Sequence, residues 1–69
     1  SEKRNYEIKI RNDKAEIEKI EKQLSEINEK ISVNQSNSSL LVELYNESEA
    51  LESRMLELME ELDSMGELN

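Results

Sequence analysis

The repeat of apolar residues changes phase once along this chain, and that change limits the folds it can adopt. In the first half, apolar side chains recur in alternating steps of three and four residues once Asp13 is counted as a polar member of the series, the heptad spacing of a coiled-coil helix. They are Tyr6, Ile10, Ile17, Ile20, Leu24, Ile27 and Ile31. A second set is out of phase with the first by three residues: Leu41, Leu44, Leu51, Met55, Leu58, Leu62 and Met65. One straight helix would leave one of these sets outside the seam.

The residues between the two sets are polar. Residues 32–39 read SVNQSNSS, mostly side chains that bond local backbone groups in turns and at helix ends. We therefore predict an all-α fold, a two-helix antiparallel coiled-coil hairpin with a helix over 3–32, a polar turn over 33–37 and a helix over 38–65. The alternative is one continuous coiled coil with a three-residue interruption of the heptads.

Single residues refine this prediction. Ser38 or Ser39 is the expected N-cap of the second helix. Gly66, the one glycine of the sequence, suits the C-terminal cap. Asp13 occupies a core position of the first heptad repeat, near the open end of the hairpin, and we expect its carboxylate to bend outward.

The pairing of the two helices is predicted from the charges beside the seam. In an antiparallel pair with these two frames, the numbers of facing core residues must add to 68 or to 75. A sum of 68 offers three attractive pairs: Lys9 with Glu61, Glu16 with Arg54 and Lys14 with Glu52. We predict this register, which packs Ile27 on Leu41, Leu24 on Leu44, Ile17 on Leu51, Ile10 on Leu58 and Tyr6 on Leu62.

Charge is divided unevenly along the chain. Residues 1–33 carry eight Lys and Arg against eight Asp and Glu, whereas residues 34–69 carry nine acidic residues and one basic residue, Arg54. The whole net charge of -8 therefore lies in the second half. A general nucleic-acid binder needs a concentrated basic face for the phosphates, so this balance argues against that class.

The residue types that most enzymes and metal sites need are missing. The sequence contains no Cys, His, Trp, Phe or Pro. This removes thiol chemistry, disulfides, the commonest zinc ligands and the usual general base. A chain of 69 residues also rarely builds a core that encloses a pocket. We expect no enzyme activity, no cofactor, no metal and no small-molecule ligand.

The chain also lacks the sequence signs of a membrane protein. No apolar run approaches the roughly 18 residues that cross a bilayer, and no signal segment opens the chain. We expect a soluble protein with no membrane partner. Because the first residue is Ser rather than Met, we expect a single domain excised from a longer protein.

A second apolar stripe runs beside the seam of the predicted second helix. Val42, Tyr45, Leu56 and Met59 occupy heptad positions b and e, outside the a and d seam. A two-helix seam cannot cover this flank, so we predict a docking face for the parent protein or for a second copy of the hairpin. The alternative is ordinary scattered surface apolarity.

The sequence resembles the C-terminal coiled-coil domain of ABC-F ATPases. The similarity covers NYEIKIRNDKAEIEKIEKQLSEINEKI (residues 5–31), a polar break, and LLVELYNESEALESRMLELMEEL (residues 40–62). Tyr6 stands among basic residues, as in the first helix of that family. The family pattern Leu-x-x-Leu-Tyr-x-x-x-x-x-Leu is matched by Leu41, Leu44, Tyr45 and Leu51. The Trp that commonly ends the second helix of family members has no counterpart in ELDSMGEL (residues 61–68).

This resemblance implies a cytoplasmic, ribosome-associated parent ATPase that acts in translation. The chain would be its non-catalytic interaction arm, in contact with RNA, ribosomal protein or the parent's own nucleotide-binding cassettes. Catalysis would belong to those cassettes, since no phosphate-binding loop is present in this sequence.

Two other functions are open. The chain could be a weak nucleic-acid-binding module that contacts phosphates without base preference. The candidate contacts are Arg4, Arg11, Lys14, Lys19 and Lys22 of the first helix. It could instead be a self-assembling structural coiled coil, for which a homodimer is the simplest form.

Overall fold

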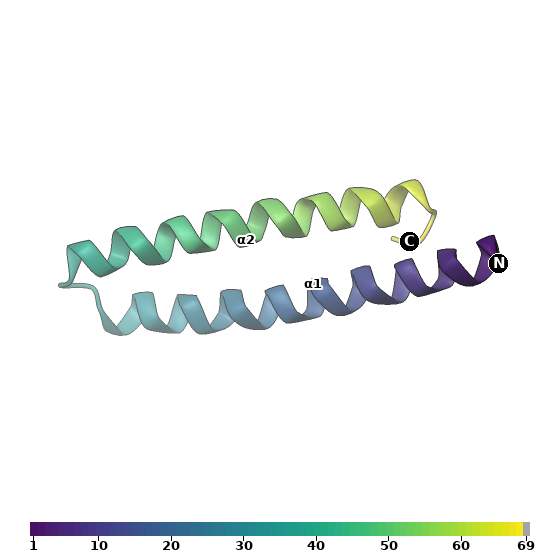
Figure 1. Cartoon of the computed structure of the whole chain (residues 1–69). Coiled ribbons are helices and arrows are strands. Elements are labelled where there is room, and N and C mark those ends of the chain that lie inside the picture. The colour runs from purple at the N-terminus through teal and green to yellow at the C-terminus, as the bar shows by residue number, and fades with distance from the viewer. Residues whose placement is uncertain (69) are drawn as a thin grey trace.

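Two long helices make up nearly all of the chain. The computed structural model describes residues 1–68, with α1 over Glu2–Val33 and α2 over Ser38–Ser64. The helices lie side by side and antiparallel, with both termini at one end (Figure 1). The longest dimension of the molecule is 53 Å, whereas one continuous helix over residues 2–64 would measure roughly 95 Å. The predicted all-α hairpin is confirmed.

Side-chain caps fix where each helix begins. The Ser1 hydroxyl accepts a hydrogen bond from the backbone N–H of Arg4 at 3.3 Å. At the start of α2, the Asn37 side-chain oxygen accepts from the N–H of Leu40 at 3.1 Å. The expected cap at Ser38 or Ser39 is therefore wrong. Asn37 has the non-helical backbone of an N-cap, with φ -103° and ψ 86°, and its oxygen reaches the first turn.

Gly66 ends α2 as predicted. Its φ of 75° lies in the left-handed region that glycine enters without steric cost. The N–H of Gly66 donates to the Asp63 carbonyl, and the N–H of Glu67 donates to the Leu62 carbonyl, both at 2.9 Å. These two bonds form a Schellman motif, which satisfies carbonyls that the last helical turn leaves free.

The core is a single seam divided into two clusters. The first joins Ile17 and Ile20 of α1 to Leu58 and Leu62 of α2. The second, nearer the turn, joins Ile27 and Ile31 to Leu44. Leu51 packs against both clusters and makes the seam continuous.

The composition of these clusters overturns the predicted register. If the numbers of facing residues added to 68, Leu58 would face Ile10 and Leu62 would face Tyr6. Both leucines would then lie at least about 10 Å along the axis from Ile17 and Ile20. The observed grouping instead fits a sum of 75, in which Leu58 faces Ile17. The same sum sets Leu44 opposite Ile31.

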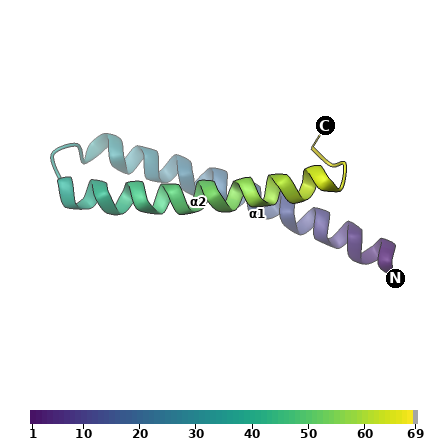
Figure 2. The ribbon, with the colours of Figure 1, turned by 90° about the horizontal axis from the view of Figure 1, so that it is seen from above.

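The open end is held by polar contacts to the segment after α2. Seen from above, the helices cross at a shallow angle (Figure 2). The Tyr6 hydroxyl donates to the Met65 carbonyl at 2.7 Å. The Lys14 ammonium lies 3.2 Å from a Glu67 carboxylate oxygen. The predicted partner of Lys14 was Glu52, so the structure places a different acid beside it.

Candidate interaction surface

Three large apolar side chains stand out from one flank of α2. Val42 is 59% exposed, and Tyr45 and Leu56 are each 57% exposed. All three were predicted to form a docking face. Their exposure follows from their b and e positions, which lie together on one side of the seam, because the a and d residues take up the contact with α1.

Met59, the fourth residue of the predicted face, lies differently. It is half-buried and packs against the cluster formed by Ile17, Ile20, Leu58 and Leu62. Its e position is adjacent to the seam, and its unbranched side chain bends toward the core. Met59 therefore belongs partly to the core of the hairpin and partly to the outer flank.

Two carboxylates interrupt the face, and the sequence prediction overlooked them. Glu49 and Glu52 occupy the same b and e positions between the two apolar pairs, and both are exposed. The heptad spacing alone places these two glutamates on the same flank as the apolar residues. We call the six residues together the apolar–acidic stripe: Val42, Tyr45, Glu49, Glu52, Leu56 and Met59.

The stripe has a definite length and order. Leu56 follows Val42 by fourteen residues, as Met59 follows Tyr45, which separates the two apolar pairs by about 21 Å along the helix. The acidic pair lies midway. Along α2 the stripe thus presents an apolar contact, a negative contact and a second apolar contact.

The basic residues proposed for phosphate contacts share α1 with carboxylates. All five are exposed: Arg4, Arg11, Lys14, Lys19 and Lys22. Arg4 and Arg11 stand at successive b positions, and the next b position is Glu18. Lys14 stands at an e position between Glu7 and Glu21, and it is paired with Glu67. The exposed surface of α1 is therefore one of alternating charge rather than a continuous basic track.

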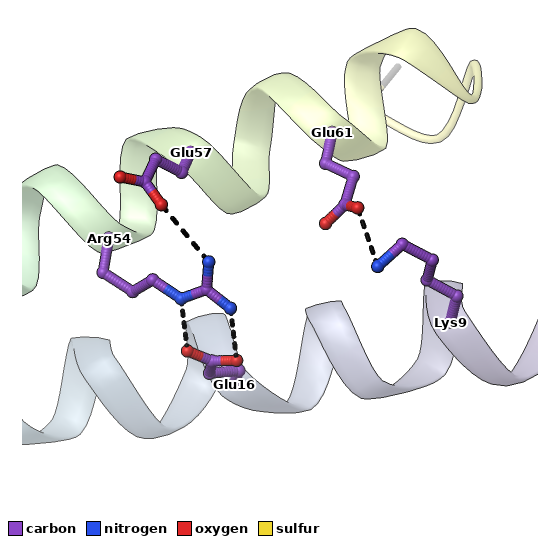
Figure 3. Close-up of polar contacts among 5 residues, drawn as sticks. All are labelled: Lys9, Glu16, Arg54, Glu57 and Glu61. Carbon is purple, nitrogen blue, oxygen red and sulfur yellow. Dashed lines mark hydrogen bonds and ion pairs between the residues drawn. The ribbon is translucent and has the colours of Figure 1, made fainter.

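Two ion pairs join the helices beside the seam (Figure 3). Arg54 donates to both oxygens of Glu16, at 2.8 and 3.1 Å, and to Glu57 at 3.3 Å. Lys9 lies 2.7 Å from Glu61. Both interhelical pairs were predicted. Figure 3 shows that the Arg54 and Lys9 side chains run obliquely along the axis to reach their partners. This reach lets both pairs form in the register with a sum of 75.

These contacts shift the acidities of the paired groups. The hydrogen bond from Arg54 holds the pKa of Glu16 below its ordinary value. The hydrogen bond to Glu61 raises the pKa of Lys9, and the same contact lowers the pKa of Glu61. Each of these four side chains keeps at least 34% of its surface exposed, so water screens the pairs and their contribution to stability is small.

Asp13 is buried, contrary to the expectation that its carboxylate bends outward. The residue is only 6% exposed. In the observed register it lies opposite Leu62, so seam residues cover it. Within residues 1–68, its Oδ2 atom has no hydrogen-bond partner. Burial raises the pKa of Asp13, and the nearby Glu61 carboxylate raises that pKa further.

Three other kinds of feature are absent from the described residues. Residues 1–68 form no pocket. No three acidic side chains among them gather closely enough to hold a metal ion. No helix within this range has both the length and the apolar character to cross a membrane. The apolar–acidic stripe is the most distinctive feature of the described surface.

Comparisons with protein-family models, with curated proteins and with solved structures give no match to this chain.

Proposed function

We propose that this chain is a non-catalytic protein-interaction arm. The hairpin would present the apolar–acidic stripe of α2 to a partner. The observation that carries this proposal is that Val42, Tyr45 and Leu56 each expose more than half of their surface on one flank of one helix.

The alignment of these side chains distinguishes them from ordinary surface residues. Single exposed apolar residues are normal on any protein. Tyr6, Ile8 and Val33 of α1 are exposed in this way. The apolar residues of the stripe instead recur at the same b and e heptad positions over several turns of α2. Tyr45 also combines an aromatic ring with a hydroxyl group, a combination enriched at the energetic centres of interfaces.

The resemblance to the C-terminal domain of ABC-F ATPases supplies the setting of the proposal. The arm would belong to a cytoplasmic, ribosome-associated ATPase of translation. Its partner would be ribosomal protein, ribosomal RNA or the cassettes of the parent. The net charge of α2 makes a protein contact the most direct use of the stripe, because phosphates and carboxylates repel.

Co-sedimentation with purified ribosomes tests this function. The 69-residue chain should pellet with ribosomes at physiological salt. Tyr45→Glu should lower the bound fraction about tenfold or more, because it removes an aromatic anchor and places a carboxylate in the contact. Circular dichroism should show the helices of this variant unchanged, since Tyr45 is not part of the core clusters.

Ala50→Glu is the matched control. Ala50 is exposed on α2 but lies outside the stripe, and the variant carries the same added charge. It should bind as the wild type does. Absence of the wild-type chain from the ribosome pellet would contradict a ribosomal partner, and equal losses in the two variants would contradict the role of the stripe.

A further inference from the structure

The order of residues in the apolar–acidic stripe specifies a kind of partner. We infer that the stripe docks a basic amphipathic helix of another protein, with apolar side chains at both ends of the contact and Lys or Arg between them. This inference rests on the proposed function of the chain as an interaction arm. It adds the shape and the charge of the ligand.

Charge complementarity is the first reason for this choice. α2 carries eight acidic residues and a single basic one. That basic residue, Arg54, is already bonded to Glu16 and Glu57. Glu49 and Glu52, at the middle of the stripe, have no ion-pair partner among residues 1–68. An approaching helix must therefore supply the positive charge opposite them, or leave two carboxylates against an apolar contact.

A second copy of the hairpin is disfavoured for the same reason. The stripe reads the same in both directions, so two antiparallel copies of α2 would set Val42 against Met59 and Tyr45 against Leu56. The same symmetry sets Glu49 of each copy against Glu52 of the other. Four carboxylates would meet at the centre with no basic residue of α2 free to join them, and like charges at an interface are destabilising.

The geometry defines the ligand further. The partner needs apolar side chains at positions i, i+3, i+14 and i+17 and basic side chains at i+7 and i+10, the spacing of the stripe itself. Such a helix spans roughly 25 Å. Because the pattern is symmetric, the partner can lie parallel or antiparallel to α2.

A labelled helical peptide with this pattern is the probe. Leucines occupy the four apolar positions, lysines the two central positions, and alanine and glutamine the rest. Fluorescence anisotropy should show that the chain binds it about tenfold more tightly than the same peptide with two central glutamates. The preference should weaken as salt is raised.

Charge reversal in the chain makes the test sharper. Glu49→Lys with Glu52→Lys should reverse the preference, so that the glutamate peptide binds more tightly. Glu43→Lys with Glu47→Lys is the matched control. It makes the same change in net charge at exposed positions of α2 outside the stripe, and it should keep the preference for the lysine peptide.

Three results would overturn the inference. They are equal binding of the two peptides, reversal of the preference by the control variant, and sedimentation of the wild-type chain as a dimer that excludes the peptide. Binding of the chain to ribosomes is measured separately. A chain that pellets with ribosomes through Tyr45 but shows no preference for lysine peptides would refute only this inference.

Discussion

A single residue, Asp13, places a carboxylate in the seam between the helices. Its Oδ2 atom is buried without a hydrogen-bond partner within residues 1–68, and the charged groups around it are Lys9, Glu61 and Arg54. A buried polar atom without a partner costs stability. Asp13 is thus the residue at which the core departs most from an apolar seam.

Asp13→Leu is therefore expected to stabilise the hairpin. The change replaces a carboxyl group whose buried Oδ2 atom has no partner within residues 1–68 with an apolar side chain opposite Leu62. It should raise the free energy of unfolding by about 1–3 kcal/mol. Urea unfolding followed by circular dichroism at neutral pH measures this gain. Asp13→Asn, which keeps a polar group in the seam, should gain less. A loss of stability in Asp13→Leu would contradict this account.

The pH dependence of the gain distinguishes the cause. The pKa of Asp13 is raised in the folded hairpin, so the folded state holds this proton more tightly than the unfolded chain does. Stability due to Asp13 is then greatest at low pH and is lost as pH rises through the folded pKa. The advantage of Asp13→Leu over the wild type should shrink as pH falls toward 4, the ordinary range of Asp. A constant advantage would exclude titration of Asp13 as its cause.

At the scale of the helix, the acidic pair of α2 acts against self-association. The apolar ends of the stripe are complementary to themselves, and only Glu49 and Glu52 oppose the pairing of two copies. We expect Glu49→Leu with Glu52→Leu to convert the chain into an antiparallel dimer through α2. Analytical ultracentrifugation measures the mass of the species in solution.

The control for dimerisation removes two other charges. Glu43→Leu with Glu47→Leu takes the same number of carboxylates from exposed positions of α2 outside the stripe. This variant should stay at the mass of the wild type. Dimers of both variants would show that net charge alone, rather than the position of the acidic pair, controls assembly.

At the scale of the whole molecule, the hairpin brings the chain ends together. The Tyr6 hydroxyl bonds the Met65 carbonyl at 2.7 Å. Spin labels at positions 3 and 64 should lie on the order of 20 Å apart, the interhelical spacing plus two label arms. Electron paramagnetic resonance measures this distance, and a separation near 90 Å would require a continuous helix.

The fold was predictable because its signals are local. Side chains in steps of three and four lie on one face of a helix whatever that helix contacts. The change of phase and the polar residues 32–39 then require a break in the helix. The observed bounds, Glu2–Val33 and Ser38–Ser64, differ from the expected ones by at most one residue at each end. The exposed position of Val42, Tyr45 and Leu56 follows from the same heptad pattern.

Register, by contrast, was decided only by the packing of the two helices. The attraction of Lys9 for Glu61 and of Arg54 for Glu16 predicted the register in which the numbers of facing core residues add to 68. Both pairs form, yet the core residues of the observed clusters face each other with numbers that add to 75. The numbers of each ion pair add to 70, so the two charged residues lie about five residues, or roughly 7.5 Å, out of line along the axis. Lys and Arg side chains span such an offset, so their pairs are compatible with either register.

The neighbours of Asp13 and Met59 were likewise decided by packing. Asp13 is buried in the seam, and Met59 packs against the cluster that contains Leu58. Sequence by itself determined which residues face the seam, because heptad spacing is a property of one helix. Tertiary structure alone decided which residues meet across the seam, because buried apolar side chains pack closely and specifically, whereas long exposed Lys and Arg side chains adapt their position to reach an acid.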